Sequence, residues 1–372
     1  MVRPRVVHIV PALFGTQGVV GGAERYAFEL ARHMAAVTPT VLVSFGERDA
    51  DQRIGALRVR TLGRPWLVRG QRSNPLSIRV LAEIAHADVV HCHQQHILVS
   101  SVAALAARAL GRLVFCTDLG GGGWDFSTYC STDRWFDGHL HLSAYSRTVA
   151  GHRDRTDAWV VHGGVDINRF SPDPDAVRGQ HAVFVGRILP HKGLDDLVDA
   201  ADGEADVRIV GPAAAPGYLQ RLHAHATGRR VTFVHGLTDD DIAAEYRTAA
   251  CAVLPSVYRD RDGHETRVPE LLGQTLLEAM ACGTPAVCTR VASLPEVVED
   301  GVTGLIVPPN DPLALRAAIR WLRHHPSDAS RMGAAGRARV LERFTWPAVV
   351  QQCLAIYDGT GRLADTRERP AA

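Results

Sequence analysis

Short runs of β-branched residues alternate with helical segments along nearly the whole chain of 372 residues. This alternation restricts the fold more than any other feature, because strands separated by helices pair in parallel and need helices on both faces of their sheet. In the first half, we expect strands at residues 5–10, 40–44, 88–92, 113–117, 139–142 and 159–162. In the second half, we expect them at residues 182–185, 207–210, 231–234, 252–254, 286–288 and 305–307.

Segments of helical composition and periodicity separate these strands. They lie at residues 23–36, 76–85, 98–110, 193–201, 239–250, 275–282, 312–323 and 332–342. About twelve strands exceed what one open sheet usually carries. The predicted fold class is therefore α/β with two doubly wound, Rossmann-like domains.

A stretch rich in Pro, Asp and Gly, Ser171–Gly179, predicts the boundary between the two domains. Residues 1–170 carry 19 arginines and 14 acidic residues, and the remainder carries 22 basic and 26 acidic residues, which gives +5 and −4. We expect an N-terminal domain of residues 1–170 and a second domain of residues 171–345. Residues 346–358 are expected to form a last helix, and residues 359–372 a frayed polar tail.

Composition excludes several classes of protein. With 46% hydrophobic and 22% charged residues, the chain is globular, and a net charge of +1 argues against nucleic acid as its main partner. Seven cysteines without a Cys-x-x-Cys pair indicate reduced thiols in a cytoplasmic protein. No run approaches the ~18 apolar residues of a membrane span. The first apolar stretch, Val6–Leu13, lacks a signal-peptide cleavage pattern and predicts a buried strand.

Lysine occurs once among the 41 basic residues, at position 192, which marks a place where a compact ammonium is preferred over a planar guanidinium. Gly186-Arg187 ends a predicted strand, and Lys192-Gly193 opens a predicted helix. Two cations and a helix N-terminus thus meet at the carboxyl edge of a parallel sheet, a position that favours phosphate. The alternative is a strand–turn–helix with solvated charges.

Two glutamates, Glu270 and Glu278, flank Gly273. A spacing of eight residues on one helix turns by about 80°, so an unbroken helix would not align their carboxylates. If Glu270 lies in a loop and Glu278 in the helix after Gly273, both can face one ligand, and carboxylates suit the paired hydroxyls of a polyol. The alternative is an acidic first turn that stabilises the helix dipole.

Several motifs, in this order, resemble the family-4 retaining glycosyltransferases, which have the GT-B fold. The N-terminal ones are Gly21-Gly22-Ala-Glu-Arg, which opens a helix after the first strand, and His162-Gly-Gly-Val-Asp166…Phe170. The C-terminal ones are Gly186-Arg187…Lys192-Gly193, Glu270…Glu278-Ala-Met-Ala-Cys-Gly-Thr-Pro, and Pro295-Glu296-Val-Val-Glu-Asp-Gly-Val-Thr-Gly-Leu-Ile-Val-Pro-Pro. Jointly they are specific and cover nearly the whole chain.

The resemblance implies a nucleotide-sugar site in a cleft between two domains, with the last helix crossing back to the N-terminal domain. Arg187 and Lys192 are implied to hold the diphosphate of a UDP- or GDP-sugar, and Glu270 to position its sugar. Glu278 is implied to bind the ribose. The donor site would also include Leu276 and the glycines Gly21 and Gly22, which would let the first loop approach the phosphates. No metal or other cofactor is expected.

One position departs from the family. Many relatives carry a histidine after the strand equivalent to residues 113–117, and this chain has Asp118 there, followed by Gly120–Gly123. Asp118 is the candidate to contact a sugar hydroxyl or to stabilise positive charge at the anomeric carbon. The four glycines predict either a lid or acceptor loop or simply a flexible loop.

Two further segments keep alternatives open. The histidines His91, His93 and His96 suggest zinc, but no clear fourth ligand accompanies them, so an acceptor-facing histidine and a core histidine are preferred. Residues 52–82 hold seven arginines and no acid around Trp66-Leu-Val. This segment predicts either contact with a membrane surface or anionic acceptor, or a solvated loop.

The preferred function is transfer of a sugar, with retention and without metal, from a nucleoside diphosphate to a hydroxyl of a small-molecule, saccharide or lipid-linked acceptor. No side chain is marked as a covalent nucleophile, which favours a front-face mechanism. The alternatives are a nucleotide-sugar epimerase or hydrolase, a non-catalytic binding module and, less favoured, a dinucleotide-dependent oxidoreductase, since residues 15–21 do not form Gly-x-Gly-x-x-Gly.

Overall fold

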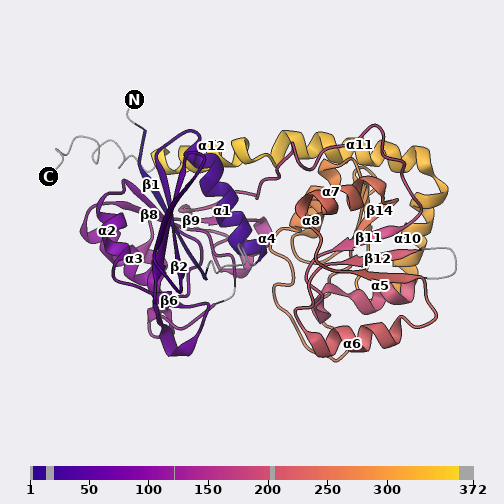
Figure 1. Ribbon diagram of the computed structural model, residues 1–372, viewed down its shortest axis with the longest axis horizontal. Helices are drawn as coiled ribbons and strands as arrows, with labels where there is room; N and C mark the ends of the chain where they lie inside the picture. The colour runs from indigo at the N-terminus through magenta and orange to yellow at the C-terminus, as the bar shows by residue number, and fades with distance from the viewer. Residues whose placement is uncertain (1–2, 14–20, 121, 202–205, 360–372) are drawn as a thin grey trace. The chain divides into compact units, whose positions relative to one another are not determined.

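The computed structural model describes residues 3–13, 21–120, 122–201 and 206–359, and it divides the chain into two compact units (Figure 1). The first unit comprises residues 1–142, 150–164 and 346–372, and the second comprises residues 143–149 and 165–345. Each unit is an α/β structure with its own sheet.

The first unit contains a sheet in the order β10-β9-β8-β7-β1-β2-β4-β3, in which only the β3–β4 pair is antiparallel. Helix α1 packs against β1, β2 and helix α12, whereas α2 packs against α3, which contacts β7 and β8 (Figure 1). The strands are β1 (Val6–Leu13), β2 (Thr40–Gly46), β3 (Ala50–Ile54), β4 (Leu57–Gly63), β7 (Val89–Cys92), β8 (Leu113–Cys116), β9 (Gly138–His141) and β10 (Ala158–Val160). The helices are α1 (Gly22–Ala35), α2 (Val80–Ala85), α3 (Leu98–Ala109) and α12 (Trp346–Gly359).

The second unit contains six parallel strands in the order β13-β12-β11-β14-β15-β16. Helix α5 packs against α6 and α10, and α8 packs against α7 and α11, so helices cover both faces of the sheet (Figure 1). The strands are β11 (Ala182–Val185), β12 (Val207–Val210), β13 (Val231–Val234), β14 (Cys251–Leu254), β15 (Ala286–Thr289) and β16 (Gly304–Val307). The helices are α4 (Ala144–Val149), α5 (Leu194–Ala200), α6 (Pro216–His225), α7 (Asp239–Thr248), α8 (Gln274–Ala281), α9 (Leu294–Val297), α10 (Pro312–His324) and α11 (Pro326–Arg343).

The division between the units falls at Gly164–Val165, before the boundary expected at 170/171. The chain just after residue 165 is fixed to the second unit, because Phe170 packs against Tyr246 of α7 and its carbonyl accepts from Arg337 of α11. The stretch Ser171–Gly179 also belongs to that unit, where Arg178 donates to carbonyls that follow α7 and α8. The Pro-, Asp- and Gly-rich composition therefore marks an ordered surface segment and not the boundary.

Two segments belong to a different unit from the residues on either side of them or just before them in the sequence. Residues 143–149, which include α4, belong to the second unit, where the carboxylate of Glu296 accepts from the backbone N–H groups of Ala144 and Tyr145. Helix α12 belongs to the first unit. The expected tail lies outside the described residues from position 360 onward, and Gly359 itself ends α12.

The arginine-rich segment forms structure that the sequence analysis missed. Leu57 and Val59 of β4 point into the core, while Arg58 and Arg60 alternate with them and remain half-exposed. Both arginines form ion pairs with Asp51, at 2.7 and 3.1 Å, and with Glu83, at 3.7 and 3.4 Å. These acids lie just outside the acid-free stretch, so part of its positive charge is neutralised within the fold. Beyond β4, Trp66–Leu67 (β5) and Pro75–Leu76 (β6) form a small antiparallel pair.

Among the described residues, no helix is both long enough and apolar enough to cross a membrane. All seven cysteines are free thiols, and only Cys130 is exposed.

Candidate functional site

The site in the second unit starts from the order of its strands. The chain winds outward from β11 to β13 on one side and from β14 to β16 on the other, so the order reverses between β11 and β14. Open parallel sheets bind ligands outside the carboxyl ends of the strands at such a reversal. The segments that follow β11 and β14 carry Arg187, Lys192, Ser256 and Glu270.

Lys192 and Glu270 form an ion pair at this edge. The Nζ of Lys192 lies 2.5 Å from Oε1 of Glu270, and the Oγ of Ser256 donates to the same oxygen at 2.6 Å. Only 13% of the Lys192 side chain and 9% of the Glu270 side chain are exposed. Removal of one partner from a buried pair typically costs about 3–5 kcal/mol, because the other charge stays poorly solvated. The structure thus brings together two residues that lie 78 positions apart.

Glycines start the two helices beside this pair. Gly193 precedes α5 with φ of +65°, and a Cβ on it would overlap the carbonyl oxygen of Pro255, the residue before Ser256. Gly273 precedes α8 with φ of +87°. Because Gly193 has no Cβ, the turn that carries Lys192 can pack directly on the backbone after β14.

Arg187 and His191, which lie in the same segment between β11 and α5 as Lys192, differ in charge. Arg187 is exposed, and no carboxylate in the described part of the chain forms an ion pair with it. Burial, followed by the nearby Lys192 charge, lowers the pKa of His191 to about 4. At neutral pH His191 is therefore uncharged, and the positive charge of this turn comes from Arg187 and Lys192.

Helix α8 begins after Gly273, so Glu270 lies in the preceding loop and Glu278 in the helix, as the sequence predicted. Glu278 is buried, and its Oε2 lies 3.5 Å from the hydroxyl of Tyr246. Leu276, which the resemblance places in the donor site, has its side chain in the core, and its backbone N–H donates to the carbonyl of Gly273. Its role toward the donor stays a prediction.

In the first unit, Gly21 precedes α1 with an extended φ of −161°, and a Cβ on Gly22 would meet no atom of the described residues within 4 Å. Neither backbone conformation therefore requires glycine, and the loop before them, residues 14–20, lies outside the described residues. Asp118 follows β8 at the carboxyl edge of the first sheet. Its Oδ1 accepts from the backbone N–H groups of Gln95 at 3.4 Å and Gly120 at 3.3 Å.

The histidines of the first unit group differently from the expected spacing. His93 stacks with both His8 and His91, the three ring centroids lie 4.5–5.2 Å apart, and all three side chains are buried. His96 is exposed, and its Nδ1 lies 3.1 Å from the Oγ of Ser127. His91 uses both nitrogens, with the Tyr357 hydroxyl at 2.7 Å and the Thr117 hydroxyl at 2.8 Å.

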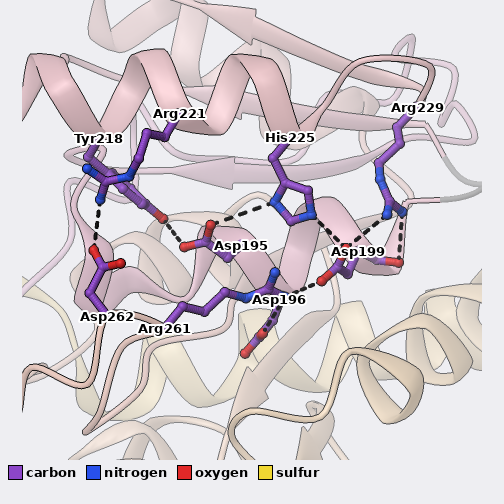
Figure 2. Close-up of polar contacts among 9 residues, drawn as sticks. All are labelled: Asp195, Asp196, Asp199, Tyr218, Arg221, His225, Arg229, Arg261 and Asp262. Carbon is purple, nitrogen blue, oxygen red and sulfur yellow. Dashed lines mark hydrogen bonds and ion pairs between the residues drawn. The ribbon is translucent and has the colours of Figure 1, made fainter.

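A polar network links the loop before Glu270 to the helix after Lys192 (Figure 2). Arg261, in the loop between β14 and α8, forms ion pairs with Asp196 and Asp199 of α5. Asp262, beside it, pairs with Arg221 of α6 at 2.8 Å. The network therefore connects the two segments that supply the Lys192–Glu270 pair.

Comparison with known proteins agrees with this geometry. Residues 20–169 match the family description Glycosyltransferase Family 4, and residues 175–339 match Glycosyl transferases group 1. The chain belongs to the family-4 glycosyltransferases. Both matches together span most of the chain, and the second contains the whole Arg187–Glu278 region.

Two relatives from Mycolicibacterium smegmatis have been named by function. A GDP-mannose-dependent α-(1-6)-phosphatidylinositol monomannoside mannosyltransferase is 34% identical over 224 residues, which cover 55% of this chain and 58% of that protein. An α-maltose-1-phosphate synthase is 37% identical over 212 residues, which cover 52% and 49% respectively. The chain thus spans about half the length of the curated relatives that it matches.

Among solved structures, HepE from Anabaena in complex with UDP and glucose has a TM-score of 0.73, with 18% identity, over 96% of this chain and all of that one. Sucrose-phosphate synthase from Thermosynechococcus elongatus has a TM-score of 0.70, with 20% identity, over 96% and 99%. At these identities the likeness establishes the fold of the chain, which is GT-B.

Sequence analysis missed two contributors to the site. Ser256 follows the apolar strand β14, and a lone serine carries no signal of its own. Arg261 lies in a stretch of mixed charge that is typical of a solvated loop, and only the position of α5 shows that it is bonded there. Both are recognisable only once β11 and β14 are neighbours.

Proposed function

We propose that this protein is a retaining glycosyltransferase that moves a sugar from a nucleoside diphosphate to an acceptor hydroxyl, by a front-face mechanism without metal. The observation that carries the proposal is the buried Lys192–Glu270 pair at the reversal of the second sheet, with the exposed Arg187 beside it. A cationic edge of this kind suits a diphosphate leaving group.

In this mechanism the bond between the anomeric carbon and the diphosphate oxygen breaks, and the acceptor oxygen bonds to the same face of that carbon. The acceptor proton passes to the departing phosphate. Lys192 and Arg187 stabilise the negative charge that develops on the diphosphate. Glu270 orients the ammonium of Lys192 and accepts from donor-sugar hydroxyls, while Glu278 is assigned to the ribose hydroxyls. Catalysis is then mainly positioning and electrostatic stabilisation.

Relatives narrow the range of donors and acceptors to test. One is named as dependent on GDP-mannose and acts on a phosphatidylinositol mannoside, and another protein of the same fold was solved with UDP. We propose that the nucleotide of the donor is UDP or GDP. The acceptor is a small molecule, a saccharide or a glycolipid.

We also propose peripheral membrane contact, through the exposed residues that follow β4. Trp66 is 61% exposed there, whereas Arg69 stacks on Trp124 at 4.6 Å. An exposed indole among arginines suits a membrane interface. Binding to anionic vesicles that falls in Trp66→Ala would support this contact, and binding unchanged in that variant would contradict it.

The deciding experiment incubates the full chain with individual UDP- and GDP-sugars and pools of acceptors, with and without EDTA, followed by mass spectrometry and NMR of the product. We expect a new glycoside with the anomeric configuration of the donor, formed equally well in EDTA. An inverted product would contradict retention, and loss of turnover in EDTA would contradict metal independence. Donor consumption without an acceptor would favour the hydrolase or epimerase alternative.

A further inference from the structure

A second group of buried histidines lies in the first unit, away from the His8 cluster. His139 and His141 share one face of β9, His152 lies in the loop before β10, and Asp133 lies in the 3-10 turn Asp133–Trp135 (η3). The three histidines are at most 4% exposed. The ring centroids of His139 and His152 are 4.4 Å apart.

Three of these residues can direct one ligand atom each to a common point. The ligand atoms of Asp133, His139 and His152 all lie within 4.8 Å of one another. The Oδ2 of Asp133 and the Nε2 of His152 are 3.3 Å apart. Two ligands about 2.0–2.1 Å from a tetrahedral zinc ion are separated by about 3.4 Å, so this pair already has the spacing of an edge of such a site.

The remaining contacts resemble an outer shell around metal ligands. The other nitrogen of His152, Nδ1, lies 3.1 Å from the Nε2 of His141, which orients the ring. The second oxygen of Asp133, Oδ1, accepts from the amide of Gln95 at 2.5 Å. Metal-bound histidines and carboxylates typically use their other polar atoms in this way.

Charge and access also permit a cation. Arg155 lies 3.9 Å from Asp133, but its guanidinium bonds both oxygens of Asp157, at 2.8 and 2.5 Å. About a quarter of the Asp133 side chain is exposed, which leaves a side from which an ion and a water ligand can enter.

Two other clusters fit a metal less well. In the His8 cluster, the nitrogens of His91 are bonded to Tyr357 and Thr117, and those of His8 to His93 and the sulfur of Met34. The cluster of Asp260, Asp262 and His264 is largely exposed and has only one nitrogen ligand. Two histidines and one carboxylate, with both histidines buried, are the better donor set for zinc.

We propose that Asp133, His139 and His152 form a zinc site that the transfer reaction does not use. The ion completes its coordination with water and fixes the η3 turn against β9. Gln95 bonds Asp133 through its side chain and Asp118 through its backbone, so the bound ion stiffens the turn beside Asp118.

The test uses the full chain stripped with EDTA and titrated with Zn²⁺ alone against a chromophoric chelator, with Co²⁺ absorption as a second readout. We expect one tight Zn²⁺ per chain and the visible absorption of tetrahedral Co²⁺. In His152→Ala and in the isosteric Asp133→Asn, we expect affinity at least about 10-fold weaker and loss of the Co²⁺ band. His264→Ala, in the exposed cluster, is the matched control and keeps both signals.

Circular dichroism in EDTA shows whether each variant is folded, and Asp133→Asn preserves the shape of the site if His152→Ala does not fold. The proposal is overturned if the wild-type chain binds no Zn²⁺, or if folded Asp133→Asn and His152→Ala bind it as tightly as the wild type. Loss of binding in His264→Ala alone would also overturn it, because the ion would then occupy the other cluster.

Discussion

The two units share one winding but carry opposite chemistry where their strand order reverses. In the second unit the reversal lies between β11 and β14, and the residues after these strands form the charged Lys192–Glu270 pair. In the first unit it lies between β1 and β7, where His8, His91 and His93 stack in the core. The same backbone topology thus presents ionic groups in one unit and imidazoles in the other.

Burial explains why the imidazoles stay uncharged. Desolvation lowers the pKa of His91 to about 3, and desolvation followed by the neighbouring histidines lowers the pKa of His8 and of His93 well below the usual value. Burial of these imidazoles therefore costs less free energy near pH 7, where they are neutral, than in acid, where they would have to be charged. The comparison teaches that the strand order sets where each sheet reverses, whereas the side chains on and after the two neighbouring strands set the charge there.

The largest expected effect is that of acid, which should destabilise the first unit, with its buried neutral histidines, before the second. The folded pKa of His91, about 3, lies below its unfolded value of about 6.5, so the unfolded chain binds more protons between these values. The stability from neutral His91 is complete above pH 6.5 and is lost as pH falls toward 3, by up to about 1.4 kcal/mol per pH unit. Hydrogen exchange at pH 7 and 4.5 should show β1 and β7 losing protection before β11 and β14. Earlier loss in β11 and β14 would contradict it.

In the second unit, Lys192→Ala should lower kcat/KM by about 10²–10³-fold, because the leaving diphosphate loses a preorganised cation. Glu270→Gln should lose less, since the amide keeps the bond to Ser256. The control is Arg208→Ala, which breaks a two-bond ion pair with Glu245 in the same unit. Equal losses in Lys192→Ala and Arg208→Ala would mean that the effect is structural.

Alanine in place of the glycine at the start of a helix should cost more free energy of unfolding in the second unit than in the first. Gly193→Ala adds the cost of a left-handed residue, about 1–2 kcal/mol, to an overlap with Pro255, so we expect a loss above about 2 kcal/mol in urea unfolding. Gly228→Ala, at φ of +79° with no atom within 4 Å, should show the backbone cost alone.

In the first unit, Gly22→Ala should leave stability within about 0.5 kcal/mol, because no atom of the described residues lies within 4 Å of the added Cβ. A fall in donor affinity in this stable variant would support the predicted close approach of the first loop to phosphate. Unchanged affinity would contradict it.

The network in Figure 2 should affect turnover more than stability. Arg261→Ala should change stability by less than about 1 kcal/mol, because its ion pairs are partly exposed, but should lower kcat by about 10-fold through displacement of the Glu270 loop. Arg229→Ala, which removes another bond to Asp199 without touching that loop, is the control. Equal kcat values in the two variants would contradict a positioning role.

Local sequence patterns predicted much of the backbone. Strands β11, β12 and β13 have the bounds expected from their sequences, because each is a short run rich in β-branched and aromatic residues between polar or turn-forming residues. Strand β4 was missed because its arginines hide an alternating pattern, and those arginines are stable there only because Asp51 and Glu83 lie beside them. The boundary was misplaced because Phe170 is held by α7 and α11, which lie far away in sequence.

By itself, the sequence determined the class of fold, the family, and the choice of Lys192, Glu270 and Glu278 as candidate site residues, since these depend on residue type and local spacing. Only the tertiary structure decided that Lys192 pairs with Glu270, that Ser256 supports them, and that His8 and not His96 joins His91. The physical reason is that a parallel sheet places residues from distant crossovers at one edge. Which strands are neighbours, and therefore which side chains meet, depends on packing across the whole sheet and not on any single segment.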